Sequence, residues 1–405
     1  MAGSALAGWL LFRRADLVLC GPWVRPRLSA DALAVASAAR GHDVQFATGP
    51  PFVGELPVPT VDIVSPDVSL GWVEQETFRR HPELATLPPD QGWRIPLELF
   101  GDVTCELLRD GLMPRVEAWR PDLVVYDVYA VGAAVAAHAC GVPAIPVGIA
   151  QWSIFSVELH RAVLDRQEQF WRRYRVERPS WPSALGVAYI DTIPPSLQGG
   201  DISTLSNRVP LRSVAWSAEG AGVPGWLLER PTRPRLYVTL GTVSYGAVPV
   251  LQAVLDASRT IDCEVLVTVG PKGDPGVLGA QPENIHVERF VAQDRVLPLV
   301  DAAVHHGGTG TLLAAFAEGL PQVLIPQGAD QFQNAGVFAR IGAGRALMPP
   351  EVASPSLAQA LQAVLHDSST RAAAEAVKVE IRKMPPPSDV VGSIEKLATR
   401  RPPGQ

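Results

Sequence analysis

The stretch "DAAVHHGGTGTLLAAFAEGLPQVLIPQGADQFQNAG", residues 301–336, decides the fold. A short apolar run ends at His305, two glycines allow a tight turn, and the periodicity predicts a helix that begins at Thr309. A second apolar run, "PQVLIP", follows and ends shortly before Asp330. Strands that alternate with helices in this way predict an α/β fold with a parallel sheet.

The same alternation extends over most of the chain. Further strands are predicted at residues 43–48, 121–127, 143–149, 236–241 and 264–270, with helical periodicity between them. The pattern lapses between Pro210 and Pro234, where proline, glycine and tryptophan interrupt the sequence. We therefore expect two doubly wound, Rossmann-like domains that face each other across a ligand cleft, because open parallel sheets bind ligands at the carboxyl ends of their strands.

Composition excludes several kinds of partner. The 405 residues are 47% hydrophobic and 19% charged, and the net charge of -6 offers no basic surface for nucleic acid or anionic lipid. The four cysteines have no CxxC spacing, which predicts neither a zinc site nor a disulfide framework. An apolar run near the start is too short to span a bilayer. We expect a cytoplasmic protein without stable membrane association, and the oligomeric state stays open, a homodimer included.

The glycine-rich turn offers a site for an anion. The backbone amides of Thr309, Gly310 and Thr311 would open the predicted helix, and a helix N-terminus binds phosphate. Taken alone, the turn is better explained by glycines that serve geometry only. Asp330 and Gln331 change this balance, because they follow the next strand and a carboxylate and an amide suit the hydroxyls of a sugar.

These residues strongly resemble the donor-binding signature of GT-B glycosyltransferases that attach nucleotide-activated sugars to natural products. The resemblance includes "VERFVAQDRVLPLVDAAVHHGG", "YIDTIPPSLQ", "LYVTLGT" and "IRKMPPPSDVV", covers about residue 33 to the end, and points to actinobacterial transferases of enediyne, polyketide and macrolide pathways. It implies an acceptor domain over 1–209, a linker over 210–234, a donor domain over 235–385, and a segment over 386–405 that returns to the acceptor domain.

The implied reaction is the inverting transfer of a deoxysugar to a hydroxyl of an aglycone by a hexosyltransferase-type enzyme. The donor would be a thymidine diphosphate sugar in preference to a uridine diphosphate sugar, and no further cofactor is implied. The sequence contains no Asp-x-Asp pair, so no metal site is implied either. A histidine and a helix N-terminus would stabilise the leaving diphosphate instead.

Residue by residue, the resemblance implies that His305 contacts the β-phosphate. Backbone groups would complete the cradle: Gly308, Thr309, Gly310 and Thr311, closed from the opposite loop by Gly241 and Thr242.

Other residues would hold the base and the sugar of the donor. Val291 would hold the base through its backbone, with an apolar plug as an equal alternative, and Asp330 with Gln331 would hold the sugar. Plant relatives hold the ribose with a glutamate eight residues after the first histidine; Leu313 stands there instead, which favours a deoxyribose.

Inverting transfer requires a base, and a histidine with a pKa near 7 suits that task. Family members carry one after the first strand, oriented by an aspartate that is matched by Asp127; the alternative role for Asp127 is to cap a helix that begins near Tyr129. Counting back from residues 40–44, the histidine should fall at Pro26 or Arg27, where none is present.

Two explanations of the missing histidine stay open. Permitted codons for Val24 to Ala32, read one nucleotide later, give Tyr-Gly-His-Ala-Tyr-Pro-Leu-Met-Pro, with the histidine codon across Pro26 and Arg27. The first explanation is therefore a frameshifted reading of residues 1–32. The second is a true loss, which leaves a catalytically impaired partner protein that binds sugar nucleotides.

On the acceptor side, Trp152 and Phe155 follow a predicted strand end and are candidates for an apolar pocket, with core packing as the alternative.

Overall fold

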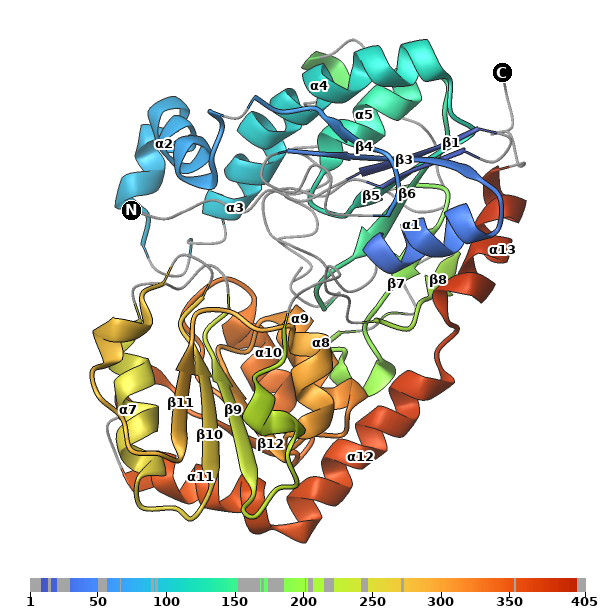
Figure 1. The fold of residues 1–405 in the computed structure, drawn as a ribbon. Helices are drawn as coiled ribbons and strands as arrows, with labels where there is room; N and C mark the ends of the chain where they lie inside the picture. The colour runs from blue at the N-terminus through green and yellow to red at the C-terminus, as the bar shows by residue number, and fades with distance from the viewer. Residues whose placement is uncertain are drawn as a thin grey trace. The chain divides into compact units, whose positions relative to one another are not determined.

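The computed structural model describes residues 9–13, 16–19, 30–49, 57–65, 67–88, 91, 94–151, 168, 171–173, 186–200, 202, 207–214, 222–241, 247–270, 273–352 and 355–398. The chain divides into two compact units (Figure 1). The N-terminal unit comprises Met1–Thr192, Gly200–Leu211 and Pro385–Gln405, and the C-terminal unit comprises Ile193–Gly199 and Arg212–Met384.

The described part of the N-terminal unit contains an eight-stranded sheet in the order β4-β3-β1-β2-β5-β6-β7-β8. β1 is antiparallel to its neighbours and the other pairs are parallel. All side chains of β5 and β6 are buried, as expected of central strands covered on both faces. The strand bounds are β1 (Trp9–Arg13), β2 (Asp16–Leu19), β3 (Asp43–Thr48), β4 (Thr60–Asp62), β5 (Leu123–Asp127), β6 (Ala144–Gly148), β7 (Tyr189–Asp191) and β8 (Arg208–Pro210).

Helices surround this sheet. They include α1 (Ala30–Ala39), α2 (Leu70–Arg80), α3 (Arg94–Glu98), α4 (Thr104–Trp119), α5 (Val131–Ala139) and α13 (Pro387–Ala398). A π-helical turn, η3 (Leu99–Val103), joins α3 to α4. α13 packs on α1, where the carboxylate of Glu395 accepts hydrogen bonds from Arg40 Nε at 2.6 Å and lies 2.8 Å from His42 Nε2.

The described part of the C-terminal unit holds a fully parallel sheet in the order β11-β10-β9-β12-β13-β14. Its strands are β9 (Arg235–Thr239), β10 (Glu264–Thr268), β11 (Ile285–Glu288), β12 (Ala302–His305), β13 (Gln322–Leu324) and β14 (Gly344–Ala346). Its helices include α7 (Val248–Ser258), α8 (Gln293–Val296), α9 (Thr309–Ala317), α10 (Gln331–Phe338), α11 (Pro355–His366) and α12 (Ser368–Lys383). Apolar side chains of β9, β12 and α11, including Val238, Val304 and Leu361, form its core.

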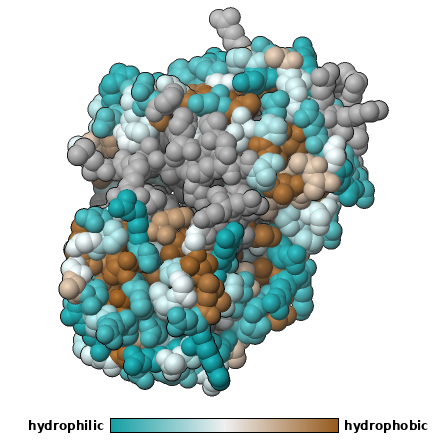
Figure 2. All heavy atoms as spheres, viewed as in Figure 1, coloured by the Kyte–Doolittle hydropathy of each residue, from teal (hydrophilic) through white to brown (hydrophobic). Residues whose placement is uncertain are grey.

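The surface of each unit mixes polar and apolar residues. On the face drawn in Figure 2, the coloured hydrophobic residues of the C-terminal unit lie in separate patches with hydrophilic residues between them. Small, divided patches are usual for a protein surface. No helix among the described residues combines the length and hydropathy that crossing a membrane requires.

Candidate functional site

Gly241, just after β9, and the glycine turn after β12 lie together at the carboxyl edge of the C-terminal sheet. β9 and β12 are hydrogen-bonded neighbours, with Thr239 opposite His305, although β10 and β11 lie between them in sequence (Figure 1). The strand order therefore reverses between β9 and β12, and open α/β sheets bind ligands at such a point. Gly241 follows one strand, and the glycine turn that leads into α9 follows the other.

His305 is held inside the sheet. It is fully buried; its Nδ1 accepts a hydrogen bond from the Gly307 amide at 3.0 Å, so Nε2 carries the proton and donates to Gln322 Oε1 at 2.7 Å. Burial lowers the pKa of His305 to about 3, which keeps the ring neutral. Both ring nitrogens are thus engaged within the unit. The contact between His305 and a β-phosphate stays a prediction, and the nitrogens that it would use are bonded to Gln322 and Gly307 in this structure.

His306 has the free ring nitrogens. Its partly buried ring lies against Gly241 and Gly308: a Cβ on Gly241 would be 2.6 Å from His306 Cε1, and one on Gly308 would collide with Nε2. Neither ring nitrogen bonds to a described residue, and Nδ1 is buried. Burial lowers the pKa of His306 to about 4, so the imidazole is neutral near pH 7. Because successive side chains along a strand point in opposite directions, His305 enters the core and His306 faces the turn.

Two positions can be compared with the plant glutamate: Ala314, eight residues after His306, and Leu313, eight residues after His305. The two side chains are 5% and 2% exposed, respectively, and both are apolar. At either position, α9 offers no carboxylate to a ribose hydroxyl.

The first turn of α9 presents open backbone amides. Gly308 is the N-cap residue, with φ -63° and ψ 139°, and no side chain of the described residues caps this end of the helix. The first intrahelical bond runs from the Leu312 amide to the Gly308 carbonyl at 3.0 Å, so the amides of Thr309, Gly310 and Thr311 precede the helical hydrogen bonds. Amides in this position favour an anion.

Asp330 ends the loop after β13 as the N-cap residue of α10, and Gln331 is the first residue of that helix. Gln331 Oε1 accepts from the amides of Gln327 at 2.7 Å and Gly328 at 3.0 Å, which leaves its NH2 group as a donor. Asp330 Oδ2 accepts from Thr309 Oγ1 at 2.6 Å, and its Oδ1 has no hydrogen-bond partner among the described residues. The loop therefore offers one carboxylate acceptor and one amide donor, a pair that suits sugar hydroxyls.

Val291 and Phe290 form a second part of this edge. The Val291 side chain is 4% exposed, while its backbone amide and carbonyl have no partner within the described part of the chain. A buried side chain with an open backbone fits both predicted roles, the plug and the base contact. Phe290 is 40% exposed and was missed by sequence reasoning; an exposed aromatic next to an open backbone is the signal that could have identified it.

Asp127 ends β5 in the N-terminal unit and has an unsatisfied oxygen. Oδ1 accepts from the Tyr129 amide at 2.9 Å, whereas Oδ2 is buried with no hydrogen-bond partner among the described residues. Burial raises the pKa of Asp127 to about 8. α5 begins after Ala130, and Asp127 Oδ1 bonds the Tyr129 amide just before it, so the capping role and the orienting role of Asp127 both stay predictions. A buried oxygen of this kind calls for a hydrogen-bond partner.

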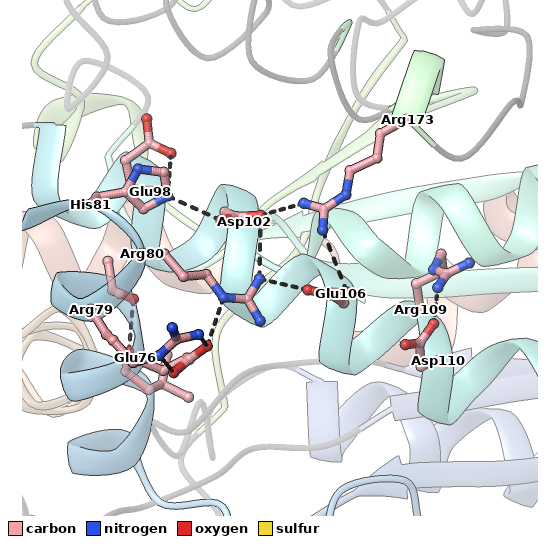
Figure 3. Close-up of polar contacts among 12 residues, drawn as sticks. Glu76, Arg79, Arg80, His81, Glu98, Asp102, Glu106, Arg109, Asp110 and Arg173 are labelled. Atoms are coloured by element: carbon pink, nitrogen blue, oxygen red, sulfur yellow. Dashed lines mark hydrogen bonds and ion pairs between the residues drawn. The ribbon is translucent and has the colours of Figure 1, made fainter.

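The described histidines of the N-terminal unit interact elsewhere. His42 lies 2.8 Å from Glu395, and His138 packs edge-on against Trp171 with 5.6 Å between the ring centroids. His81 Nε2 lies 3.0 Å from Asp102 Oδ2, and Figure 3 shows this pair inside a network of arginines and carboxylates. No hydrogen bond joins any of these three to Asp127.

The network in Figure 3 joins α2, η3 and α4. Asp102 is 5% exposed and its Oδ1 accepts from Arg173 Nη1 at 2.7 Å. Arg80 donates to Glu76 at 2.8 Å and to Glu106 at 2.6 Å. His81 therefore belongs to this network through its contact with Asp102.

Several predicted site residues cannot be placed. Thr242, Trp152, Phe155, Pro26 and Arg27 lie outside the described residues.

The two α/β units, with the switch-point site of the second, define a GT-B glycosyltransferase. Residues 35–241 and 252–397 match the models of the N-terminal and C-terminal domains of the Erythromycin biosynthesis protein CIII-like family. The chain belongs to this family of actinobacterial natural-product glycosyltransferases, which confirms the predicted fold class and the resemblance.

Individual glycosyltransferases are similar to this chain over most of its length. The chain is 28% identical to TDP-daunosamine transferase DnrS of Streptomyces peucetius over 92% of this chain and 95% of the relative. It is 30% identical to 10-deoxymethynolide desosaminyltransferase of Streptomyces venezuelae over 73% and 72%. The crystal structure of the glycosyltransferase SnogD from Streptomyces nogalater superposes with a TM-score of 0.76 at 28% identity, covering 92% of this chain and 95% of SnogD.

Proposed function

We propose that this chain transfers a deoxysugar from a thymidine diphosphate sugar to a hydroxyl of a polyketide-type aglycone, with inversion at the anomeric carbon. The main support is the position of His306. Its ring lies against the backbones of Gly241 and Gly308, beside the open amides of α9, and its nitrogens bond to no described residue. The name of the relative DnrS, a TDP-daunosamine transferase, supports the choice of nucleotide.

The C-terminal unit would stabilise the leaving group. Negative charge grows on the diphosphate as its bond to the anomeric carbon breaks. The amides of Thr309 to Thr311 and the neutral His306 ring would donate hydrogen bonds to that charge. Asp330 and Gln331 would hold the sugar through the carboxylate oxygen and the amide hydrogens that remain unbonded. This arrangement requires no metal ion.

The acceptor hydroxyl would lose its proton to a histidine while its oxygen attacks the anomeric carbon and the diphosphate departs. Asp127 would orient that histidine, since its buried Oδ2 has no donor in the described residues. The histidine itself would be the one that a frame-corrected reading places across Pro26 and Arg27.

A second function follows from the absence of a histidine at Pro26 and Arg27. If the histidine is truly absent, the chain would bind sugar nucleotide as a partner protein and would turn it over poorly. The coding DNA of Val24 to Ala32 separates the two cases, because the frameshift requires codons that give histidine one base later.

The test combines binding and turnover. Titration calorimetry with thymidine diphosphate is expected to show saturable binding to the chain as written. Sugar transfer is expected only after the reading frame is corrected. Transfer at equal rates by both forms would contradict the assigned base, and absence of binding by either form would contradict the donor site.

A further inference from the structure

Asn334 lies between the glycine turn that precedes α9 and the loop that ends at Asp330. It is 1% exposed on α10, and its Nδ2 lies 2.9 Å from the Gly307 carbonyl and 2.9 Å from Asp330 Oδ2. A third contact, of 3.0 Å, reaches Thr309 Oγ1, which itself donates to Asp330 at 2.6 Å. One buried amide thus joins the turn before α9, the first residue of α9 and the carboxylate of the next loop.

We propose that Asn334 is a positioning residue that couples the glycine turn at Gly307 to the carboxylate of Asp330. A change at Asp330 would then alter how the turn binds the diphosphate. The inference rests on the proposed function, which assigns these two parts to the two halves of the donor. It adds that the halves are recognised cooperatively, through a residue that touches neither.

The chemistry of the side chain supports this role. The amide of Asn334 donates to Asp330 Oδ2, and together with Thr309 it fixes the rotation of the carboxylate so that Oδ1 is the oxygen left for a ligand. The same NH2 group donates to the Gly307 carbonyl, and Gly307 precedes the N-cap of α9 with φ +84°. Removing the NH2 group would therefore release both the carboxylate and the turn.

Substitution by aspartate is the sharpest probe. Asn334→Asp keeps the shape of the side chain but replaces the NH2 donor by an oxygen beside Asp330, which gives two carboxylates four residues apart on one helix turn. The exchange variant Asp330→Asn/Asn334→Asp restores one donor facing one acceptor. Asn284→Ala is the matched control, because Asn284 Nδ2 donates to the Cys263 carbonyl at 2.8 Å in the same unit, before β11.

The experiment measures the dissociation constant of thymidine diphosphate, which has no sugar for Asp330 to hold. Asn334→Asp is expected to weaken binding about tenfold, and Asp330→Asn is expected to weaken it several-fold, about the loss of one neutral hydrogen bond. The exchange variant should bind more tightly than Asn334→Asp, because the pair at 330 and 334 is restored while the bond to the Gly307 carbonyl stays lost. Asn284→Ala should leave the affinity unchanged. Circular-dichroism melting confirms that each variant is folded.

The outcomes separate this inference from the proposed function. No binding of thymidine diphosphate by the parent chain overturns the proposed function. Normal binding by the parent and by Asp330→Asn overturns the inference, because the carboxylate would then be independent of the turn. Should Asn334→Asp fail to fold, Asp330→Asn decides alone: parental affinity for thymidine diphosphate in that variant contradicts the coupling.

Discussion

His305 donates from Nε2 to Gln322 Oε1 at 2.7 Å inside the C-terminal sheet, and its Nδ1 accepts from the Gly307 amide at 3.0 Å. The neighbouring His306 lies against Gly241 and Gly308 and has no bonded ring nitrogen among the described residues. Two adjacent histidines therefore have different tasks, one in the core and one at the site.

Alanine substitutions should separate these tasks. His306→Ala is expected to weaken binding of thymidine diphosphate about 10- to 100-fold, the effect of one hydrogen bond to a charged group, with little change in unfolding free energy. His305→Ala should lower the unfolding free energy by about 1–3 kcal/mol, because it leaves Gln322 buried without its partner. Calorimetric titration and urea unfolding measure the two effects; the reverse pattern would contradict the assignment.

The stability of the C-terminal unit should depend on pH through His305. Its pKa is about 3 in the folded chain, against an ordinary value of 6.5, so between these values the unfolded chain binds a proton that the folded chain does not. The stabilising contribution is therefore present above pH 6.5 and is lost as the pH falls toward 3, with a slope of at most about 1.4 kcal/mol per pH unit. Urea unfolding across this range should be less steep in pH for His305→Gln. Identical slopes would argue against a buried neutral histidine.

Gly308 should tolerate no side chain. Its φ of -63° and ψ of 139° suit alanine, so Gly308→Ala tests only the collision with His306 Nε2. We expect weaker binding of thymidine diphosphate, because the ring must move. Gly328→Ala is the control, since a Cβ there meets nothing within 4 Å. Equal affinities in the two variants would show that the ring position is unimportant.

Asp127 should give the opposite pH dependence. Its pKa is about 8 in the folded chain, against an ordinary 3.8, so the folded chain holds a proton between these values that the unfolded chain has lost. Stability from this group is present below pH 3.8 and is lost as the pH rises toward 8. Asp127→Asn should therefore match the parent at low pH and exceed it in unfolding free energy at pH 8. A difference that does not change with pH would contradict the buried, unpartnered carboxyl.

Much of the fold could be predicted from the sequence because the strands are continuous apolar runs. The prediction at 43–48 coincides with β3, and the runs at 121–127 and 143–149 contain β5 and β6. β7, β8 and β14 were missed, since each has only three residues and the sequences "YID", "RVP" and "GRA" carry no periodic signal.

The candidate site could be predicted only in part. The sequence located His305 and His306 at a strand end, but which of them faces the turn depends on the register that pairs His305 with Thr239 and Leu324. Asn334 had a usable signal, its position four residues after Asp330 at the start of a predicted helix. The unpaired oxygen of Asp127 had none, because an unsatisfied atom is a property of the packed structure.

Titration of the chain with thymidine diphosphate, repeated on His306→Ala and His305→Ala, tests the central claim most directly. The donor site predicts saturable one-to-one binding to the parent and a loss of about tenfold or more in His306→Ala. It predicts a smaller loss in His305→Ala, which removes only the bond to the Gly307 amide, at a temperature where that variant is folded. Absence of binding to the parent, or a loss confined to His305→Ala, would contradict it.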